Sequence, residues 1–435
     1  MKSANDFLNS IGANSSISRR GESLEKTLEC VKYVGIRWFR SGYEGNIPLE
    51  DQIHVYNETG AKFSYGLASG GNDLARLMQG AEILADAGAL LALEGNNEPN
   101  NWGIKYNGEE GGRDKTWVPV AKIQADLYKM AKCNPKLKDY PVFSIGGESG
   151  AQVDNAGLQY LIIPDGVDTL MPAGTQFADY ANVHNYFCHP SLRKLIDNIT
   201  WYASDPTLET VPGNGGKFDN LYGNYGVMWG GGKFKGYSND ELKTLPRVTT
   251  ETGITIGTYN GSVDEEMHGR LIVSMYLSQF AQGYDYTALY IMRDRSDEGG
   301  NQTFGMYTTD YTPRKAAIYL HNLTTILADD KSADNITAFE YTIPNQPDVV
   351  HDMVLQHSDG SLSLVIWSER FTGGTDEITV NFGNACNAEI YDIICGTEPI
   401  QSYSDVSSVA MTLNCNPYVV RVRAFKKAVQ NFGNK

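Results

Sequence analysis

Leu93-Glu-Gly-Asn-Asn-Glu-Pro-Asn-Asn101 is the stretch that decides the fold of this chain, together with a second stretch, Arg247-Val-Thr-Thr-Glu-Thr-Gly253. Each stretch ends a short run of β-forming residues at a turn, and the turns carry Glu98 and Glu251. A carboxylate at the C-terminal tip of a strand has a fixed position, and the loop that follows opens it to a ligand. The two glutamates are therefore a candidate acid/base and nucleophile pair.

Around these stretches, apolar or β-branched runs alternate with amphipathic stretches from residue 10 to about residue 328, which is typical of repeated βα units. We expect eight strands, the number that closes a (β/α)8 TIM barrel, with Glu98 after the fourth and Glu251 at the end of the seventh. The expected ranges are 10–15, 34–41, 61–68, 90–97, 141–147, 180–187, 246–251 and 286–292.

Helix signals lie between the expected strands. Ser23 precedes a helical repeat of apolar residues, and Gly35 is well placed to end it. For the last helix, we expect Thr312 as the cap and Pro313 at the first helical position. Its expected buried residues are Ala316, Leu320, Leu323 and Leu327.

Two further segments complete the domain organisation. Residues 190–245 exceed a plain βα connection and are rich in Gly, Tyr, Trp and Lys, which indicates a wall or roof over a binding cleft, with a surface decoration as the alternative. After residue 333, seven short alternating runs, two of which are 377–382 and 388–394, predict an antiparallel β-sandwich. We therefore expect a catalytic barrel over residues 1–330 and a sandwich domain over residues 333–428.

Composition excludes several classes of partner. The 435-residue chain has a formal charge of -16 and a pI near 4.9, which argues against nucleic acid and anionic membrane surfaces because both require clustered Lys and Arg. No apolar run approaches the length of a bilayer span. The acidic balance suits a neutral or cationic ligand. The sequence leaves the oligomeric state open.

No cofactor or metal motif is present in the sequence. The six cysteines show no C-x-x-C spacing, and His184 with His189 lacks the one-turn spacing and third ligand of a zinc site. The N-terminal residues lack the apolar segment of a signal peptide. We expect a secreted or periplasmic protein whose signal peptide is not part of this sequence, with a cytoplasmic location as the alternative.

Glycosidic bond hydrolysis is the chemistry that a pair of glutamates at barrel strand ends suits best. One carboxylic acid must protonate the leaving oxygen while a second carboxylate acts on the opposite face of the anomeric carbon. Asn97, next to Glu98, can donate to a sugar 2-hydroxyl, and Pro99 stiffens the turn. The expected partner is an oligosaccharide or polysaccharide.

The chain resembles the clan A glycoside hydrolases, which are retaining enzymes on a (β/α)8 barrel. The resemblance rests on Asn97-Glu98-Pro99 and Thr249-Thr-Glu251-Thr-Gly253, and it extends to Gly35-Ile-Arg-Trp-Phe-Arg40 and His184-Asn-Tyr186. It implies Glu98 as acid/base, Glu251 as nucleophile, Arg40 near the nucleophile, and His184 or Tyr186 approaching the same carboxylate. Within the clan, the pattern is most similar to families 39, 30 and 5.

The implied roles carry electrostatic expectations. Arg40 would keep Glu251 ionised, while Tyr186 or His184 could donate a hydrogen bond to it. The pKa of Glu98 would be raised by the negative charge of Glu251. A buried ion pair for Arg40 and a core histidine for His184 are the alternatives.

The sequence departs from the clan at the end of the eighth strand, where a tryptophan often floors the sugar subsite. Tyr290 stands near that position, and Trp102 or Trp229 could provide the stacking surface. Arg293 could contact an anionic or heavily hydroxylated sugar, or it could form a salt bridge at the rim.

Three hypotheses follow. The first is a retaining β-glycosidase or endo-β-glycanase that works by double displacement. The second is a non-catalytic carbohydrate-binding protein on the same barrel, against which the retention of both glutamates, Asn97 and Arg40 argues. The third is an inverting hydrolase with other carboxylates, such as Glu94 or Glu148, although Glu94 fits a supporting position at the strand end better.

Overall fold

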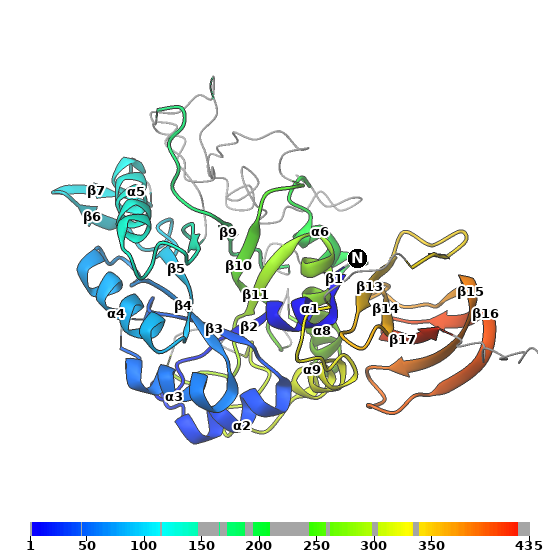
Figure 1. Cartoon of the computed structure of the whole chain (residues 1–435). Coiled ribbons are helices and arrows are strands. Elements are labelled where there is room, and N and C mark those ends of the chain that lie inside the picture. The colour runs from blue at the N-terminus through cyan, green and yellow to red at the C-terminus, as the bar shows by residue number, and fades with distance from the viewer. Residues whose placement is uncertain are drawn as a thin grey trace, which may run out of the picture. The chain divides into compact units, whose positions relative to one another are not determined.

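The computed structural model describes residues 2–44, 46–113, 115–146, 165, 172–187, 195–208, 243–257, 262–297, 303–333 and 339–424 (Figure 1). The chain divides into two compact units, Leu8–His321 and a second unit made of Met1–Phe7 with Asn322–Lys435. The second unit includes the N-terminal residues because β1 (Lys2–Ser3) pairs in parallel with β13 (Val350–Gln356). A single boundary at about residue 330 would assign the N-terminal residues to the barrel, whereas they belong to the second unit.

Eight parallel strands form the barrel of the first unit, as the alternation of β-forming and amphipathic runs predicts. In space, the order is β8-β5-β4-β3-β2-β11-β10-β9, and a parallel bridge between Phe143 and Tyr180 joins the two ends. The strands are β2 (Ile11–Asn14), β3 (Trp38–Ser41), β4 (Lys62–Leu67), β5 (Leu90–Asn96), β8 (Val142–Phe143), β9 (Ala181–Val183), β10 (Arg247–Thr252) and β11 (Tyr284–Leu289).

Helices follow the strands along the chain, and Figure 1 shows α2, α3 and α4 on the outside of the neighbouring strands. In α2, the Ser23 side chain accepts from the Lys26 N–H, and Gly35 ends the helix at a φ of 84°. The helices are α1 (Ala4–Ser10), α2 (Leu24–Val34), α3 (Leu49–Thr59), α4 (Leu74–Asp86), α5 (Val118–Cys133), α6 (Ile199–Ser204), α8 (Glu265–Ala281) and α9 (Lys315–Ile326). A hairpin of β6 (Ile104–Tyr106) and β7 (Glu109–Gly111) precedes α5.

Helix α9 begins later than expected. The helix starts at Lys315, because Pro313 is held in an antiparallel bridge with Tyr307 and not at the first helical position. A pairing within the loop before the helix has therefore overridden the preference for Thr312 as the cap. The four side chains expected to be buried are nevertheless fully buried.

The barrel interior beneath the site is filled by Trp38, Ala92, Phe143, Val248 and Ala288, which come from five different strands. The Trp38 indole fits because position 12 is glycine: a Cβ there would lie 2.2 Å from the Trp38 ring. Alternation along β3 places Arg40 on the same face as Trp38, toward the C-terminal end of the barrel. This packing gives the charged site above it a rigid base.

The second unit is an antiparallel β-structure, to which β1 adds its parallel edge strand. Its elements are β12 (Tyr341–Thr342), β13, β14 (Leu362–Ser368), β15 (Asp376–Asp392), β16 (Gln401–Leu413) and β17 (Pro417–Ala424). Two expected strands, 377–382 and 388–394, are one strand, β15, whose pairing with β16 shifts register between Asn381 and Ala388. The first half of β15 pairs with β12 and the second half with β17, so this one strand joins the two groups of strands. Their shared core includes Leu364, Val380, Ile390 and Val420.

Within residues 190–245, the structure describes only 195–208 and 243–245, so a wall or roof formed by that segment stays a prediction. None of the described helices has the length and apolar character that a bilayer span requires.

Candidate active site

The end of β10 sends two consecutive side chains into the mouth of the barrel. Its pairing with β11 shifts register between Thr249 and Thr252, so Thr250 and Glu251 lie within an irregularity of the ladder. Such a bulge re-aims a side chain that strict alternation would turn away. The Thr250 hydroxyl donates to Glu94 at 2.9 Å, and Glu251 Oε1 lies 2.5 Å from the Arg40 guanidinium.

Arg40 connects three acidic or amide side chains from two other strand ends. Its Nε donates to Glu94 at 2.9 Å, one terminal nitrogen to Glu251, and the other to Asn97 Oδ1 at 2.8 Å. The Tyr43 ring lies 4.3 Å below the guanidinium carbon. Arg40 is 1% exposed, so these contacts replace its water and fix the planar group in one orientation.

Glu98 follows β5 in a strained turn with a φ of 41°, a left-handed value that bulky residues seldom adopt. The turn is held because the Glu98 N–H donates to the Gly146 carbonyl at 3.0 Å. Its side chain is anchored at both oxygens: Asn101 donates to Oε2 at 2.9 Å, and His184 Nδ1 lies 2.8 Å from Oε1. The Glu98 side chain is partly exposed, at 17%, and is therefore open to a ligand.

His184 and Tyr186 bring the two glutamates into one site. The Tyr186 hydroxyl donates to Glu251 Oε2 at 3.0 Å, and His184 Nδ1 lies 3.6 Å from the same oxygen. One oxygen each of Glu98 and Glu251 and a ring nitrogen of His184 all lie within 4.8 Å of one another. The described part of the chain thus contains a compact pair of carboxyl groups at the C-terminal end of the barrel.

The pKa directions of the two glutamates are the reverse of the sequence expectation. Burial raises the pKa of Glu98, but the hydrogen bond and charge of His184, with help from Asn101, outweigh burial and lower it to about 2. Burial also raises the pKa of Glu251, and there His184 and Arg40 only partly offset it. The expectation was wrong because it gave the histidine to Glu251, whereas the ring lies closer to Glu98.

Of the described residues, Glu98, His184 and Glu251 are the group whose spacing could hold a metal ion. Arg40, however, already places a positive charge 2.5 Å from Glu251 Oε1. A cation bound there would be repelled by the guanidinium, so the arrangement suits carboxylate chemistry better than metal binding.

Three other expected site residues lie around the pair. Asn97 is engaged at both ends of its amide, since Nδ2 donates to Ser69 at 3.0 Å while Oδ1 accepts from Arg40. Trp102 lies in the turn after Glu98 and is 51% exposed, so its ring is open to a ligand. Tyr290 packs edge to face on Tyr186, at 6.4 Å between ring centres, as part of an aromatic wall near Glu251.

Arg293 is not brought to the pair, which corrects its expected substrate contact. Its guanidinium donates to the carbonyl of Thr309 and, at 3.2 Å, to that of Asp294, and it covers the Tyr311 ring at 4.8 Å. The loop after β11 turns this side chain toward its own residues. Trp229 and Glu148 lie outside the described residues.

The sequence reasoning missed Thr250, Asn182 and Tyr43. Asn182 donates to Thr250 at 3.0 Å, and it stands two residues before His184, so alternation along β9 could have placed both on one face. Thr250 directly precedes Glu251 and would be assigned to the opposite face without knowledge of the bulge. Glu94 lies at the strand end in the supporting position that was expected.

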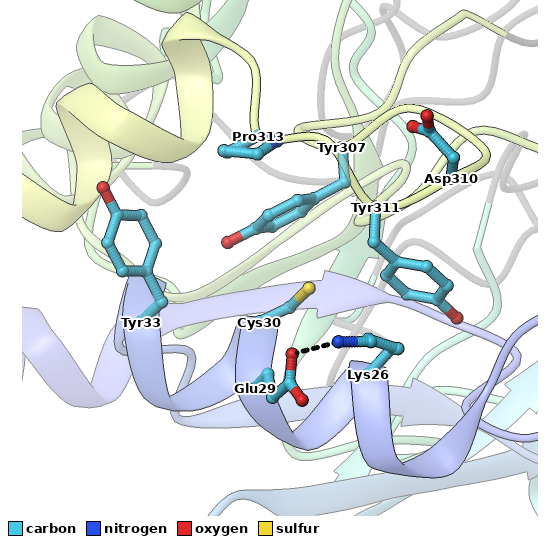
Figure 2. A pocket seen from close by; sticks show the side chains of 8 residues that line it. All are labelled: Lys26, Glu29, Cys30, Tyr33, Tyr307, Asp310, Tyr311 and Pro313. Atoms are coloured by element: carbon cyan, nitrogen blue, oxygen red, sulfur yellow. Dashed lines mark hydrogen bonds and ion pairs between the residues drawn. The ribbon is translucent and has the colours of Figure 1, made fainter.

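A separate pocket of about 260 Å³ lies between α2 and the loop before α9 (Figure 2). Three of its polar side chains are engaged within the chain: Lys26 pairs with Glu29 at 2.7 Å, and the Tyr311 hydroxyl accepts from the Ser23 N–H at 2.6 Å. Burial raises the pKa of the Cys30 thiol to about 11, so the sulfur is not a ready nucleophile. This pocket is therefore not a competing catalytic site.

Known proteins resemble this chain in structure. The sequence matches no family model and no curated protein. A family 39 glycoside hydrolase from the gut symbiont Bacteroides cellulosilyticus WH2 superposes with a TM-score of 0.56 at 15% identity, covering 96% of this chain and 82% of the other. CelM2, a bifunctional glucanase-xylanase from a metagenome library, gives 0.54 at 13% identity over 98% of both chains. A GH51 α-L-arabinofuranosidase from Thermotoga petrophila RKU-1 gives 0.54 at 9% identity over 96% of both. The chain therefore has the barrel and β-sandwich fold of the clan A glycoside hydrolases, as the sequence motifs indicated.

Proposed function

We propose that this protein is a retaining glycoside hydrolase that cleaves β-linked glycosides or polysaccharides. The main support for this proposal is the short separation of the two carboxyl groups. One oxygen of Glu98 and one of Glu251 lie within 4.8 Å of each other. Retaining enzymes hold the pair about 5–5.5 Å apart, whereas inverting enzymes need about 6.5–9.5 Å to admit a water. The compact pair therefore supports double displacement.

In this mechanism, Glu251 attacks the anomeric carbon while the leaving oxygen takes a proton from Glu98. Arg40 and the Tyr186 hydroxyl hold Glu251 in place through its two oxygens, so each oxygen has a fixed direction. After the leaving group departs, Glu98 takes a proton from water, and the hydroxide oxygen displaces Glu251 from the anomeric carbon. The ester bond to Glu251 thus forms and breaks on the face of the sugar ring opposite the leaving group and the water. The two successive inversions retain the configuration of the anomeric carbon.

The test is hydrolysis of aryl glycosides by the wild type, Glu98→Ala and Glu251→Ala, with and without azide. The panel includes β-glucosides, β-xylosides and α-L-arabinofuranosides, because the structural neighbours include a glucanase-xylanase and an arabinofuranosidase. We expect Glu251→Ala to lose activity and azide to rescue Glu98→Ala as a glycosyl azide of retained configuration.

Two outcomes would overturn the proposal. A product of inverted configuration, followed by NMR during turnover, would exclude the retaining mechanism. A carbohydrate-binding protein would be favoured if the wild type binds an oligosaccharide but hydrolyses no substrate, and if either substitution changes only the affinity. Glu98→Gln is the matched variant, since it keeps the shape of the side chain and removes only its acidity.

A further inference from the structure

Both ring nitrogens of His184 have fixed partners. Nδ1 lies 2.8 Å from Glu98 Oε1, and Nε2 lies 3.1 Å from the Thr250 hydroxyl oxygen. The histidine is only 1% exposed, so protein partners decide which nitrogen carries hydrogen. The choice matters for catalysis because Glu98 needs a proton that it can give away.

The Thr250 hydroxyl has one hydrogen, and its best acceptor is Glu94 Oε1 at 2.9 Å. Glu94 is bound by Arg40, and a carboxylate paired in this way can only accept hydrogen bonds. The rival acceptor, Asn182 Oδ1 at 3.1 Å, is neutral and already takes the Thr250 backbone N–H. The amide nitrogen of Asn182 donates to the Thr250 oxygen at 3.0 Å, which agrees with that oxygen acting as an acceptor.

It follows that the Thr250 oxygen accepts from Nε2–H of His184. A neutral ring with hydrogen on Nε2 has a bare lone pair on Nδ1. The 2.8 Å contact between Nδ1 and Glu98 Oε1 therefore needs a proton of its own, placed on either atom. We propose that Thr250 and Glu94 are positioning residues that fix hydrogen on His184 Nε2 and thereby keep the transferable proton in the His184–Glu98 hydrogen bond.

This inference rests on the proposed function and deepens it. In the first half of the reaction, the glycosidic oxygen takes the proton from the His184–Glu98 hydrogen bond. At the same time the covalent bond between that oxygen and the anomeric carbon breaks, and the ester to Glu251 forms. In the second half, water returns a proton to the same bond, and its oxygen displaces Glu251. Glu98 touches the substrate throughout, while His184 holds the proton beside it.

The opposite tautomer would not serve as an acid. If Thr250 donated to Nε2, a neutral His184 would carry hydrogen on Nδ1 and present it to an ionised Glu98, and a neutral imidazole does not give up that hydrogen. The other charged or titratable groups that face the His184–Glu98 pair are Arg40, Glu251 and Tyr186, and Glu94 lies behind Thr250. The hydrogen bond of Nε2 goes to Thr250 and to none of these four groups, so Thr250 controls the tautomer.

Kinetics with two leaving groups test the role of Thr250. We expect Thr250→Val to lower kcat/KM about tenfold or more for a phenyl or alkyl glycoside, since positioned proton transfer contributes about 10²–10⁴-fold. The 2,4-dinitrophenyl glycoside of the same sugar leaves without a proton and should lose less than about threefold. Thr250→Ser should restore the phenyl rate and the alkaline limb of its pH profile. Equal losses on both substrates would overturn the proposal.

Thr252→Val is the matched control. Thr252 is also buried on β10, and its hydroxyl donates to the Asn185 carbonyl at 3.0 Å, away from the histidine. Its substitution should affect both substrates equally, so any general damage to the strand is visible. The melting temperature of each variant is measured alongside.

A measurement without turnover separates this inference from the proposed function. Nitrogen-15 NMR of histidine-labelled protein, with the His184 signal assigned by comparison with His184→Asn, reports which nitrogen carries hydrogen. We expect hydrogen on Nε2 in the wild type and in Thr250→Ser, whether or not Nδ1 also carries the shared proton, and a shift toward the neutral form with hydrogen on Nδ1 alone in Thr250→Val. A wild-type signal of the form with hydrogen on Nδ1 alone would overturn the inference even in an active enzyme. Failure to cleave any glycoside would count against the function alone.

Discussion

The Arg40 guanidinium lies 2.5 Å from Glu251, although the two residues are 211 positions apart in the sequence. Both are almost completely buried, and burial alone raises the pKa of Glu251. In the proposed mechanism this carboxylate attacks the anomeric carbon, and its negative charge depends on His184 and on the Arg40 contact, which both oppose the effect of burial.

Replacement of Arg40 by methionine should raise the pKa of Glu251 further, because burial remains while one of the two compensating charges, next to that of His184, is lost. The proposed nucleophile must be ionised to attack, so the acid limb of the kcat/KM profile should move to higher pH. At pH 6, we expect a loss of about 100-fold or more, which corresponds to about 3 kcal/mol. Arg40→Lys is the matched variant and should lie between, since lysine keeps the charge but not the three directed hydrogen bonds. An acid limb that stays in place would contradict this dependence.

Tyr186→Phe removes the hydroxyl that donates to Glu251 Oε2 at 3.0 Å. Hydrogen bonds to charged groups contribute about 1.5–3 kcal/mol, so kcat should fall about 10- to 100-fold without a change of fold. Tyr128→Phe is the control, because it removes a hydroxyl that donates to Asp179 at 3.1 Å on the outside of the barrel. Similar kinetics for both variants would show that the Glu251 contact has no role in turnover.

Gly146→Ala should displace His184 without touching any acidic group. A Cβ at position 146 would lie 2.2 Å from His184 Nε2, so the ring must tilt away from its partners. We expect a loss of kcat/KM of about tenfold or more on phenyl glycosides. A double-mutant cycle with His184→Ala identifies the route, since adding Gly146→Ala to that variant should cost little further activity. Additive losses would mean that the glycine acts elsewhere.

Removal of His184 should raise the pKa of the Glu98 carboxyl. In the folded protein, the histidine and Asn101 outweigh burial and lower the pKa of Glu98 to about 2. In His184→Gln, burial remains without the charge, so the pKa of Glu98 should rise. Carbon-13 NMR of labelled glutamate carboxyl groups measures the change directly, with Glu98→Gln to assign the signal. A titration that stays near pH 2 would contradict the assigned cause.

His351 should make the second unit sensitive to acid. The ring packs against Trp367 and is 7% exposed, and burial lowers its pKa to about 3. The unfolded chain takes up the proton near pH 6.5, so stability is complete above that value and is lost as the pH falls toward 3. At pH 5, the loss is about 2 kcal/mol. His351→Phe should therefore show a smaller fall in unfolding free energy between pH 7.5 and pH 5 than the wild type. An equal fall would assign the acid sensitivity to other groups.

Local sequence patterns were sufficient for much of the architecture. The eight barrel strands, the order in which they follow one another and the change to an antiparallel sandwich could be predicted, because side-chain periodicity and turn residues act over a few positions. The same patterns placed Glu98 and Glu251 at strand ends, and parallel strands bring such ends to one edge of a barrel. Two strands expected near residues 377–394 are one, since only pairing with β16 shows that the chain continues through the irregularity.

By itself, the sequence determined that Glu98, Glu251, Arg40 and His184 lie at the barrel mouth, because each stands near the end of a predicted parallel strand. Only the tertiary structure decided how these residues face one another. The bulge in β10 turns Thr250 and Glu251 into the same site, and the loop after β11 turns Arg293 away from it. His184 lies closer to Glu98 than to Glu251, and the glycine at position 146 leaves room for its ring. These directions depend on register and on contacts between distant strands, which no local periodicity encodes.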